Sequence, residues 1–74
     1  MNIIIYSKPN CTFCEQAKNL LTIKGYTYEE RDITNIKHLV ELKNLIPDVK
    51  TVPQIYINNQ YIGGFTQLKE YLSK

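Results

Sequence analysis

Three consecutive isoleucines near the start of the chain, Ile3 to Ile5, restrict its possible folds more than any other feature. β-Branched residues favour strands, and an apolar run without polar alternation is typical of a strand covered on both faces. We therefore predict a buried strand over residues 2–6, followed by a loop over residues 7–10 that contains Pro9. A sheet built around such a strand needs helices on both sides.

The next segment shows helical and then strand spacing. Apolar residues recur on one helical face at Phe13, Ala17, Leu20 and Leu21. They predict a helix over residues 12–24, and Gly25 is placed to end it. A more polar strand is expected over residues 26–32, nearer the edge of the sheet. Strand, helix and strand in this order predict a parallel, right-handed βαβ unit.

The second half continues the alternation. A helix is predicted over residues 35–46, with Thr34 or Asn35 as its cap. Its apolar side is expected to contain Ile36, Leu39, Val40 and Ile46. Pro47-Asp48 ends this helix.

The remaining residues predict a hairpin and a closing helix. Two strands, residues 54–57 and 61–62, flank Asn58-Asn59-Gln60, which is typical of a hairpin turn. The last helix is expected over residues 66–73. The predicted order is β-α-β-α-β-β-α, an α/β fold in which helices flank a four-stranded mixed sheet. The 74 residues are expected to form a single domain, residues 1–74.

The charge and hydropathy of the sequence limit the classes of function that the protein can have. The net charge is +2, and the nine basic residues are scattered among seven acidic ones, which gives little support to nucleic-acid binding. The longest apolar run is far shorter than the roughly 20 residues of a membrane span, and no secretory signal is visible. We therefore expect a cytoplasmic monomer without nucleic-acid or membrane partners.

Two cysteines, Cys11 and Cys14, lie where the first predicted helix begins. At this spacing they share one helical face, so their sulfurs can bond. A bridge that closes so short a loop stabilises little, which favours a chemical role over a structural disulfide. Zinc is a further alternative, but it needs four ligands, and the chain offers only His38, expected to be a solvated surface residue, beside the thiols. Covalent haem attachment needs histidine where Glu15 stands.

The two thiols are not equivalent. Cys11 lies near the unpaired N–H groups and the positive end of the helix dipole, which favours a thiolate. Such settings bring thiol pKa values to roughly 3.5–7.5. Lys8 can add a positive charge, whereas Cys14 lacks these donors. We predict that Cys11 attacks a disulfide and that Cys14 resolves the product.

Three segments, in their order and spacing, resemble the glutaredoxin family: Ser7-Lys8-Pro9-Asn10-Cys11-Thr12-Phe13-Cys14, Thr51-Val52-Pro53 and Gly63-Gly64-Phe65-Thr66. The resemblance covers nearly the whole chain and implies a thioredoxin-like fold. It also implies a glutathione-dependent thiol–disulfide oxidoreductase that reduces protein disulfides and glutathione mixed disulfides through Cys11 and Cys14. Expected partners are glutathione and disulfide-containing or glutathionylated proteins, with ribonucleotide reductase as a partner known in the family.

The resemblance further implies a glutathione-binding groove. Lys8 and Phe13 match residues that flank it, and Pro53 matches the family's cis-proline. Thr51 and Val52 match the segment whose backbone pairs with the cysteinyl unit, as in a short strand addition. The γ-glutamyl site is matched by Gly64, Phe65 and Thr66, at a helix N-terminus that suits a carboxylate. Lys8 and Lys50 can attract the other carboxylate.

The chain also departs from the family pattern. Thr12 and Phe13 stand where Pro and Tyr are common, and family members without that proline more often accept a glutathione-bridged iron–sulfur cluster. This cluster is therefore an open alternative, although no metal is expected otherwise. Thr66 stands where many members carry aspartate, which predicts weaker binding of the glutathione amino group. A flavoprotein thioredoxin reductase is the alternative electron source.

Overall fold

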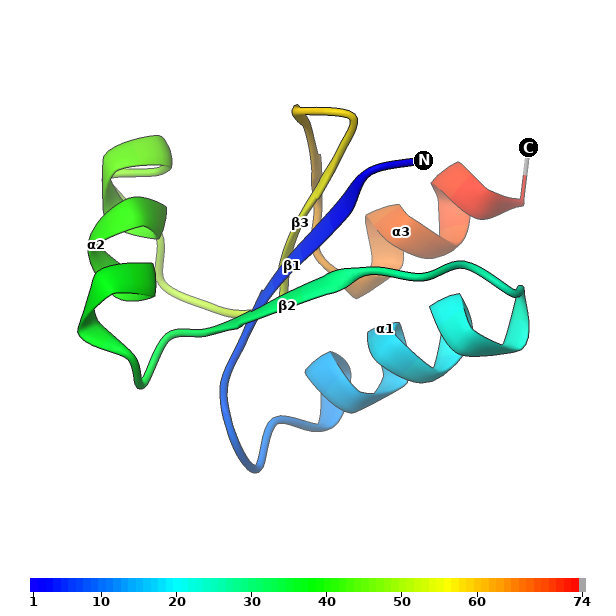
Figure 1. Ribbon diagram of the computed structural model, residues 1–74, viewed down its shortest axis with the longest axis horizontal. Coiled ribbons are helices and arrows are strands. Elements are labelled where there is room, and N and C mark those ends of the chain that lie inside the picture. Colours follow the sequence, from blue (N-terminus) through cyan, green and yellow to red (C-terminus); the bar gives the residue numbers. More distant parts are fainter. Residues whose placement is uncertain (74) are drawn as a thin grey trace.

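The computed structural model describes residues 1–73, so Lys74, the last residue of the predicted domain, lies outside the described residues. The elements follow one another as β1 (Ile3–Ser7), α1 (Thr12–Ile23), β2 (Glu29–Asp32), α2 (Ile36–Leu45), β3 (Gln54–Ile57), β4 (Gln60–Gly63) and α3 (Phe65–Leu72) (Figure 1). This order confirms the predicted β-α-β-α-β-β-α fold. None of the described helices is long and apolar enough to cross a membrane.

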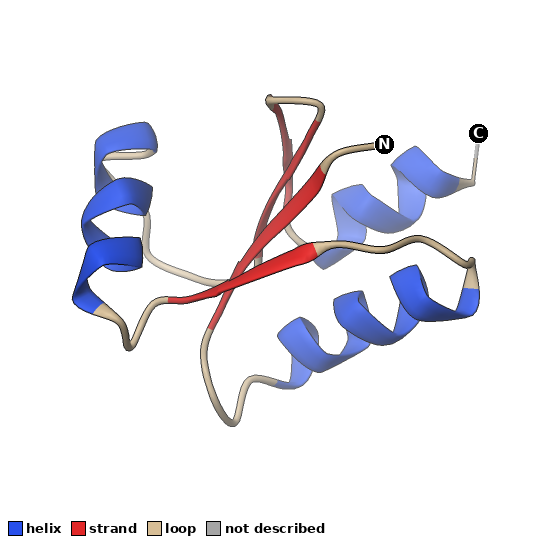
Figure 2. Cartoon of the chain, viewed as in Figure 1, coloured by secondary structure: helices blue, strands red, loops and turns tan. Residues whose placement is uncertain are grey.

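The four strands form one mixed sheet in the order β2-β1-β3-β4. β1 pairs in parallel with β2, while the β1–β3 and β3–β4 pairs are antiparallel. Helices α1 and α3 lie on one side of the sheet and α2 lies on the other (Figure 2). The predicted mixed sheet between helices is therefore confirmed, and the βαβ unit is parallel as expected.

Alternate residues of β1 and β3 supply the main core. Four isoleucines face α1 and α3 and pack with buried residues of these helices: Ile3, Ile5, Ile55, Ile57, Ala17, Leu21 and Leu68. Full burial of one such aliphatic side chain contributes roughly 1.5–3 kcal/mol. These contacts fix the position of α1, and with it the position of the two cysteines at its start.

The other face of β1 is covered by a mixed aromatic and polar layer. Tyr6 meets Tyr56 edge to face, with ring centroids 6.3 Å apart. The Arg31 guanidinium donates a hydrogen bond of 3.0 Å to the Tyr6 hydroxyl, and its ion pair with Glu29 raises the pKa of Arg31. β1 is thus covered on both sides, as its isoleucine run predicts.

Helix α1 begins and ends close to the predicted residues, but its buried stripe starts elsewhere. Gly25 adopts a φ of +80° just beyond the helix, as expected for a helix-ending glycine. Cys14, Ala17 and Leu21 are buried, whereas Phe13 is 59% exposed. Phe13 thus lies on the predicted stripe but outside its buried part. Consecutive helical residues point in different directions, and Cys14 takes the position nearest the sheet.

The strand β2 is shorter than predicted. It begins at Glu29 because pairing with β1 starts at the Ile4–Glu29 pair. The backbone N–H of Tyr26 instead donates to the Leu21 carbonyl at 2.9 Å, which ties this residue to the end of α1. β2 is an edge strand, as its polar sequence predicts.

Helix α2 has the predicted cap, but its buried face differs in part from the predicted one. The Asn35 side chain accepts the Lys37 N–H at 3.0 Å. Within α2 only Leu42 is buried, while Ile36 and Val40 are exposed. The other two predicted residues, Leu39 and Ile46, are half-buried, so the predicted apolar side is correct only in part. Helix α2 packs against the edge strand β2 and covers only a narrow stripe. His38 is half-buried, with Nδ1 3.1 Å from the Asp32 carbonyl oxygen, so it is not merely solvated.

The hairpin and the helix after it are close to the prediction. Asn58 and Asn59 both have positive φ, +52° and +65°, which suits a tight two-residue hairpin turn. Helix α3 begins at Phe65, and Gly64 rather than Thr66 precedes its first turn. The Gly64 N–H donates to the Gln67 side-chain oxygen at 2.9 Å. Thr66, at which the helix was expected to start, therefore lies inside the first turn.

Gly63 is placed where a side chain does not fit. Its φ is +122°, and a Cβ there would lie 2.8 Å from Cγ of Gln67. We expect Gly63→Ala to lower the free energy of unfolding by about 1–3 kcal/mol, the usual cost of such backbone strain. Urea unfolding measures this. Gly25→Ala is the control, because its φ of +80° imposes backbone strain as well but its Cβ meets open space, so we expect it to destabilise the protein less than Gly63→Ala does. Equal destabilisation by both variants would contradict the close contact at Gly63.

Candidate active site

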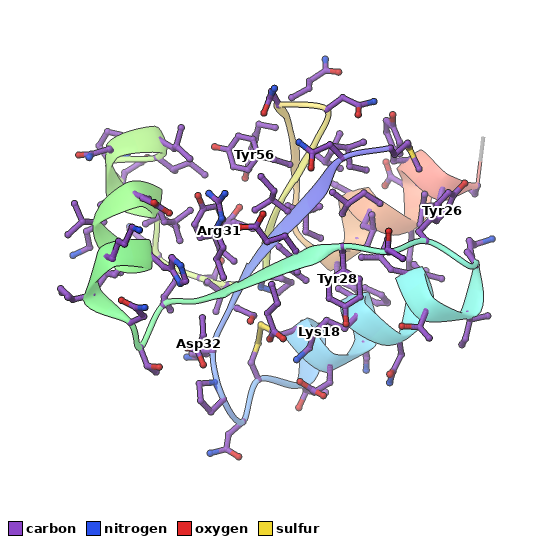
Figure 3. The ribbon with its side chains drawn as sticks, in the orientation of Figure 1. Lys18, Tyr26, Tyr28, Arg31, Asp32 and Tyr56 are labelled. Atoms are coloured by element: carbon purple, nitrogen blue, oxygen red, sulfur yellow. A yellow bond between two sulfur atoms is a disulfide. The ribbon has the colours of Figure 1, made fainter. Side chains whose placement is uncertain are left out.

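The two cysteines lie at the start of α1 and are joined by a disulfide, with Cα atoms 5.2 Å apart (Figure 3). Cys11 is the N-cap residue of the helix, and Cys14 lies one turn further. The chain turns into the helix at Asn10, whose φ is +58°. Cys11 keeps 9% of its surface exposed, whereas Cys14 has none. A substrate can therefore reach Cys11 but not Cys14.

The Cys11 sulfur lies in the field of the helix N-terminus. Its Sγ accepts the backbone N–H of Cys14 at a distance of 3.2 Å. The first N–H groups of a helix have no partner within it, and they make this end positive. The same N–H groups stabilise a thiolate at Cys11 when the disulfide is reduced. This arrangement agrees with the predicted asymmetry between the two thiols.

A groove of about 590 Å³ lies next to Cys11. Its lining comes from the start of α1, the loop before β3, strand β4 and the start of α3: Phe13, Thr51, Val52, Pro53, Gln54, Tyr61, Ile62, Gly63, Gly64, Phe65, Thr66 and Gln67. The Val52 carbonyl oxygen lies 3.5 Å from the Cys11 sulfur, so the groove borders the disulfide at this residue. The Val52–Pro53 peptide bond is cis.

Two contacts hold the walls of the groove together. The rings of Phe13 and Phe65 lie with centroids 6.2 Å apart. Gly64 approaches the loop before β3 closely, since a Cβ on it would lie 3.4 Å from the Pro53 carbonyl oxygen. The groove is thus formed by segments from three distant parts of the sequence.

The structure brings most of the predicted site residues together. Seven of the eight predicted groove residues line this groove: Phe13, Thr51, Val52, Pro53, Gly64, Phe65 and Thr66. Lys8 does not. It lines a second hollow of about 150 Å³, with Lys43 and Lys50, which shares Thr51 and Val52 with the groove.

The sequence reasoning missed five groove residues, namely Gln54, Tyr61, Ile62, Gly63 and Gln67. Gln67 stands three residues after Gly64, the spacing typical of a helix-start capping interaction, and could have been found from it. Gln54 and Tyr61 come into contact only when β3 pairs with β4, so their spacing along the sequence does not reveal the contact.

A polar network anchors the end of β1, from which the Cys11 loop starts. The buried Ser7 hydroxyl donates to Glu30 at 2.6 Å, and Lys18 pairs with Glu30 at 2.9 Å. The hydrogen bond from Ser7, together with Lys18, holds the pKa of Glu30 below its usual range. Lys18 also pairs with Glu15 at 2.6 Å, and the two carboxylates raise its pKa. The Lys18 side chain, labelled beside α1 in Figure 3, is therefore held between the two carboxylates, which neutralise its charge.

Within residues 1–73, no three His, Cys, Asp or Glu side chains gather closely enough to hold a metal ion. A cluster bridged between two copies needs one accessible thiolate from each chain. Cys11 fits that requirement when reduced, whereas the fully buried Cys14 does not.

Comparison with known proteins places the chain among redox proteins. The family model described as glutaredoxin matches residues 3–62. Glutaredoxin 3 of Escherichia coli (strain K12) is 39% identical over 67 residues, which cover 90% of this chain and 81% of that protein. Glutaredoxin 1 of Rickettsia bellii is 40% identical over 70 residues, which cover 89% and 71%.

Some relatives are longer than this chain. It is 36% identical over 72 residues to the hybrid peroxiredoxin hyPrx5 of Haemophilus influenzae, which covers 97% of this chain but only 30% of that protein. It spans 63% of glutaredoxin 1 from Rickettsia conorii.

Solved structures agree with this assignment. Glutaredoxin 1 from Francisella tularensis, complexed with cacodylate, has a TM-score of 0.79 and 27% identity, over 99% of this chain and 98% of that one. Reduced Escherichia coli glutaredoxin has a TM-score of 0.78 and 29% identity, over 99% and 94%. A sequence match and a shared fold over nearly the same residues mean that the chain belongs to the glutaredoxin family, whose members are thiol–disulfide oxidoreductases.

Proposed function

We propose that the chain is a glutathione-dependent oxidoreductase that reduces protein disulfides and glutathione mixed disulfides. The observation that carries the proposal is the position of the Cys11 sulfur. It accepts a helix N-terminal N–H, retains exposed surface and lies 3.5 Å from a backbone carbonyl at the border of a groove. A thiolate at this position is stabilised and accessible, as a nucleophile must be.

Removal of glutathione from a mixed disulfide needs only Cys11. Its thiolate attacks the glutathione sulfur, the Cys11–glutathione disulfide forms, and the substrate thiolate leaves and takes a proton from solvent. A second glutathione thiolate then attacks the bound glutathione sulfur. Glutathione disulfide leaves, and the Cys11 thiolate returns to its place beside the Cys14 N–H.

Reduction of a protein disulfide needs both cysteines. Cys11 attacks one substrate sulfur, and the second substrate sulfur leaves as a thiolate. The Cys14 thiolate then attacks Cys11, which releases the reduced substrate and leaves the Cys11–Cys14 disulfide seen in the structure. Two glutathione molecules reduce this disulfide and leave as glutathione disulfide.

The groove suits an extended tripeptide on both chemical and steric grounds. Thr51 and Val52 can pair with the backbone of the cysteinyl unit, as in strand addition. At the other end, the N-terminus of α3 at Phe65 and Thr66 suits the γ-glutamyl carboxylate. Phe13 and Phe65 form an apolar wall between these ends.

A coupled assay tests the proposal. Glutathione, glutathione reductase, NADPH and a small glutathione mixed disulfide are expected to give NADPH oxidation that depends on this protein. Absence of turnover under these conditions would contradict the proposed function. Turnover with NADPH and a flavoprotein thioredoxin reductase, without glutathione, would instead identify the alternative electron source.

A second candidate is an iron–sulfur carrier, favoured by Thr12 between the cysteines and by the accessible Cys11. Here the Cys11 thiolates of two copies, with glutathione, hold a bridging cluster. Anaerobic reconstitution with iron, sulfide and glutathione distinguishes the candidates. A brown dimer supports the carrier, and a colourless monomer contradicts it. The expected cytoplasmic location is part of the main proposal, since glutathione keeps thiols reduced there.

A further inference from the structure

A chain of two hydrogen bonds connects strand β4 to the loop beside Cys11. The Tyr61 hydroxyl donates to Oε1 of Gln54 at 2.6 Å. Nε2 of Gln54 donates to the Thr51 carbonyl oxygen at 2.9 Å. Gln54 is only 9% exposed, so water replaces these partners poorly. The Gln54 side chain is therefore held between the hairpin and the loop.

The donor and acceptor properties of these groups fix the direction of both hydrogen bonds. The Thr51 carbonyl can only accept, so the Gln54 nitrogen must face it. The Gln54 oxygen then faces the Tyr61 hydroxyl, which must donate. The Thr51 carbonyl thus selects the orientation of the Gln54 amide, and the Tyr61 hydroxyl stabilises this orientation by donating to the Gln54 oxygen.

The direction of the Thr51 carbonyl determines the direction of the next N–H. Among the described residues, only the Val52–Pro53 peptide bond is cis, so the Thr51–Val52 bond is trans. In a trans peptide plane the C=O and the N–H point to opposite sides. Because Gln54 holds the Thr51 carbonyl, the Val52 N–H points away from Gln54, and no hydrogen bond among the described residues uses it.

We propose that Tyr61 and Gln54 are positioning residues that orient the Thr51–Val52 peptide for backbone pairing with a cysteine-containing peptide such as glutathione. The inference rests on the proposed function, since the Val52 carbonyl lies beside the Cys11 sulfur and its N–H is the donor left for a substrate. Neither residue touches the reacting sulfurs. They act on substrate binding and leave the sulfur chemistry unchanged.

The variant Tyr61→Phe tests this role. It keeps the ring and removes only the donor. One hydrogen bond contributes about 0.5–1.5 kcal/mol, so we expect KM for a glutathione mixed disulfide to rise roughly 2- to 10-fold. We expect kcat to be unchanged.

Tyr56→Phe is the matched control. Tyr56 lies directly opposite Tyr61 in the hairpin, with ring centroids 5.4 Å apart. Its hydroxyl takes no part in the chain to Thr51. We expect this variant to leave both KM and kcat unchanged.

A second readout does not depend on turnover. Titration of the reduced protein with S-methylglutathione, which cannot form a disulfide, is followed at the Val52 amide by NMR. We expect a large shift of this amide in the unmutated protein and in Tyr56→Phe, with weaker binding in Tyr61→Phe. Gln54→Met, which removes both hydrogen bonds, is expected to weaken binding further, and circular dichroism checks that it folds.

The possible failures are distinguishable. An unmutated protein without glutathione turnover contradicts the proposed function. An active unmutated protein, together with normal KM and normal S-methylglutathione binding in Tyr61→Phe, overturns the positioning role. A fall in kcat at unchanged KM in Tyr61→Phe also overturns it.

Discussion

Replacing Cys14 with serine is expected to slow the reduction of protein disulfides sharply while leaving removal of glutathione from mixed disulfides intact. Cys14 is fully buried and in bonding position to Cys11, so it can resolve a Cys11–protein disulfide within the molecule. An intramolecular thiol in this geometry far exceeds millimolar glutathione in effective concentration, and we expect a loss of about 100-fold. Deglutathionylation requires no second protein thiol.

Two assays on the same preparation measure this split. Insulin reduction, followed by turbidity, reports protein disulfides, and the coupled glutathione assay reports mixed disulfides. Thermal unfolding serves as a control, because a serine hydroxyl at a fully buried position needs a hydrogen-bond partner. If a folded Cys14→Ser variant lost both activities equally, the resolving role of Cys14 would be rejected.

Cys11→Ser is expected to remove both activities, by at least about 10³-fold, because a serine hydroxyl is not ionised near neutral pH and its oxygen cannot replace sulfur in disulfide exchange. Cys14 remains in this variant but has no exposed surface, so it cannot substitute as the attacking thiol. The coupled assay measures the loss.

Mass spectrometry provides the matched comparison. Incubation with glutathione disulfide is expected to add one glutathione to Cys14→Ser and none to Cys11→Ser. Turnover by Cys11→Ser would show that Cys14 can attack the substrate, and it would contradict the roles assigned to the two thiols from their positions at the α1 N-terminus.

Local signals were sufficient for the order of the elements. The isoleucines of β1 form a strand because of their own shape, and Gly25 and the Asn58-Asn59 turn adopt positive φ, as their residue types allow. The start of β2 was not predictable in this way, because it depends on the register with β1. The buried face of α2 was predicted only in part, because its apolar residues surround the helix and packing selects among them.

The candidate site likewise combines residues that local sequence signals predict with residues that only tertiary packing brings together. Residues within the three short motifs could be placed in a groove, because each motif carries its own turn or helix start. Lys8 belongs to the first motif, yet it lies at the second hollow because the loop leads its side chain to the other side of Thr51 and Val52. The contact between Gln54 and Tyr61 depends on the pairing of Tyr56 with Tyr61 across the hairpin. Spacing along the chain does not reveal it.

The edge strand β2 has a consequence for the behaviour of the protein at high concentration. All four of its residues, Glu29 to Asp32, are charged. An unpaired strand edge is a template on which further chains can add and grow into fibrils, but desolvating a row of charges opposes such growth. The molecule is thus protected from ordered aggregation along this side of the sheet.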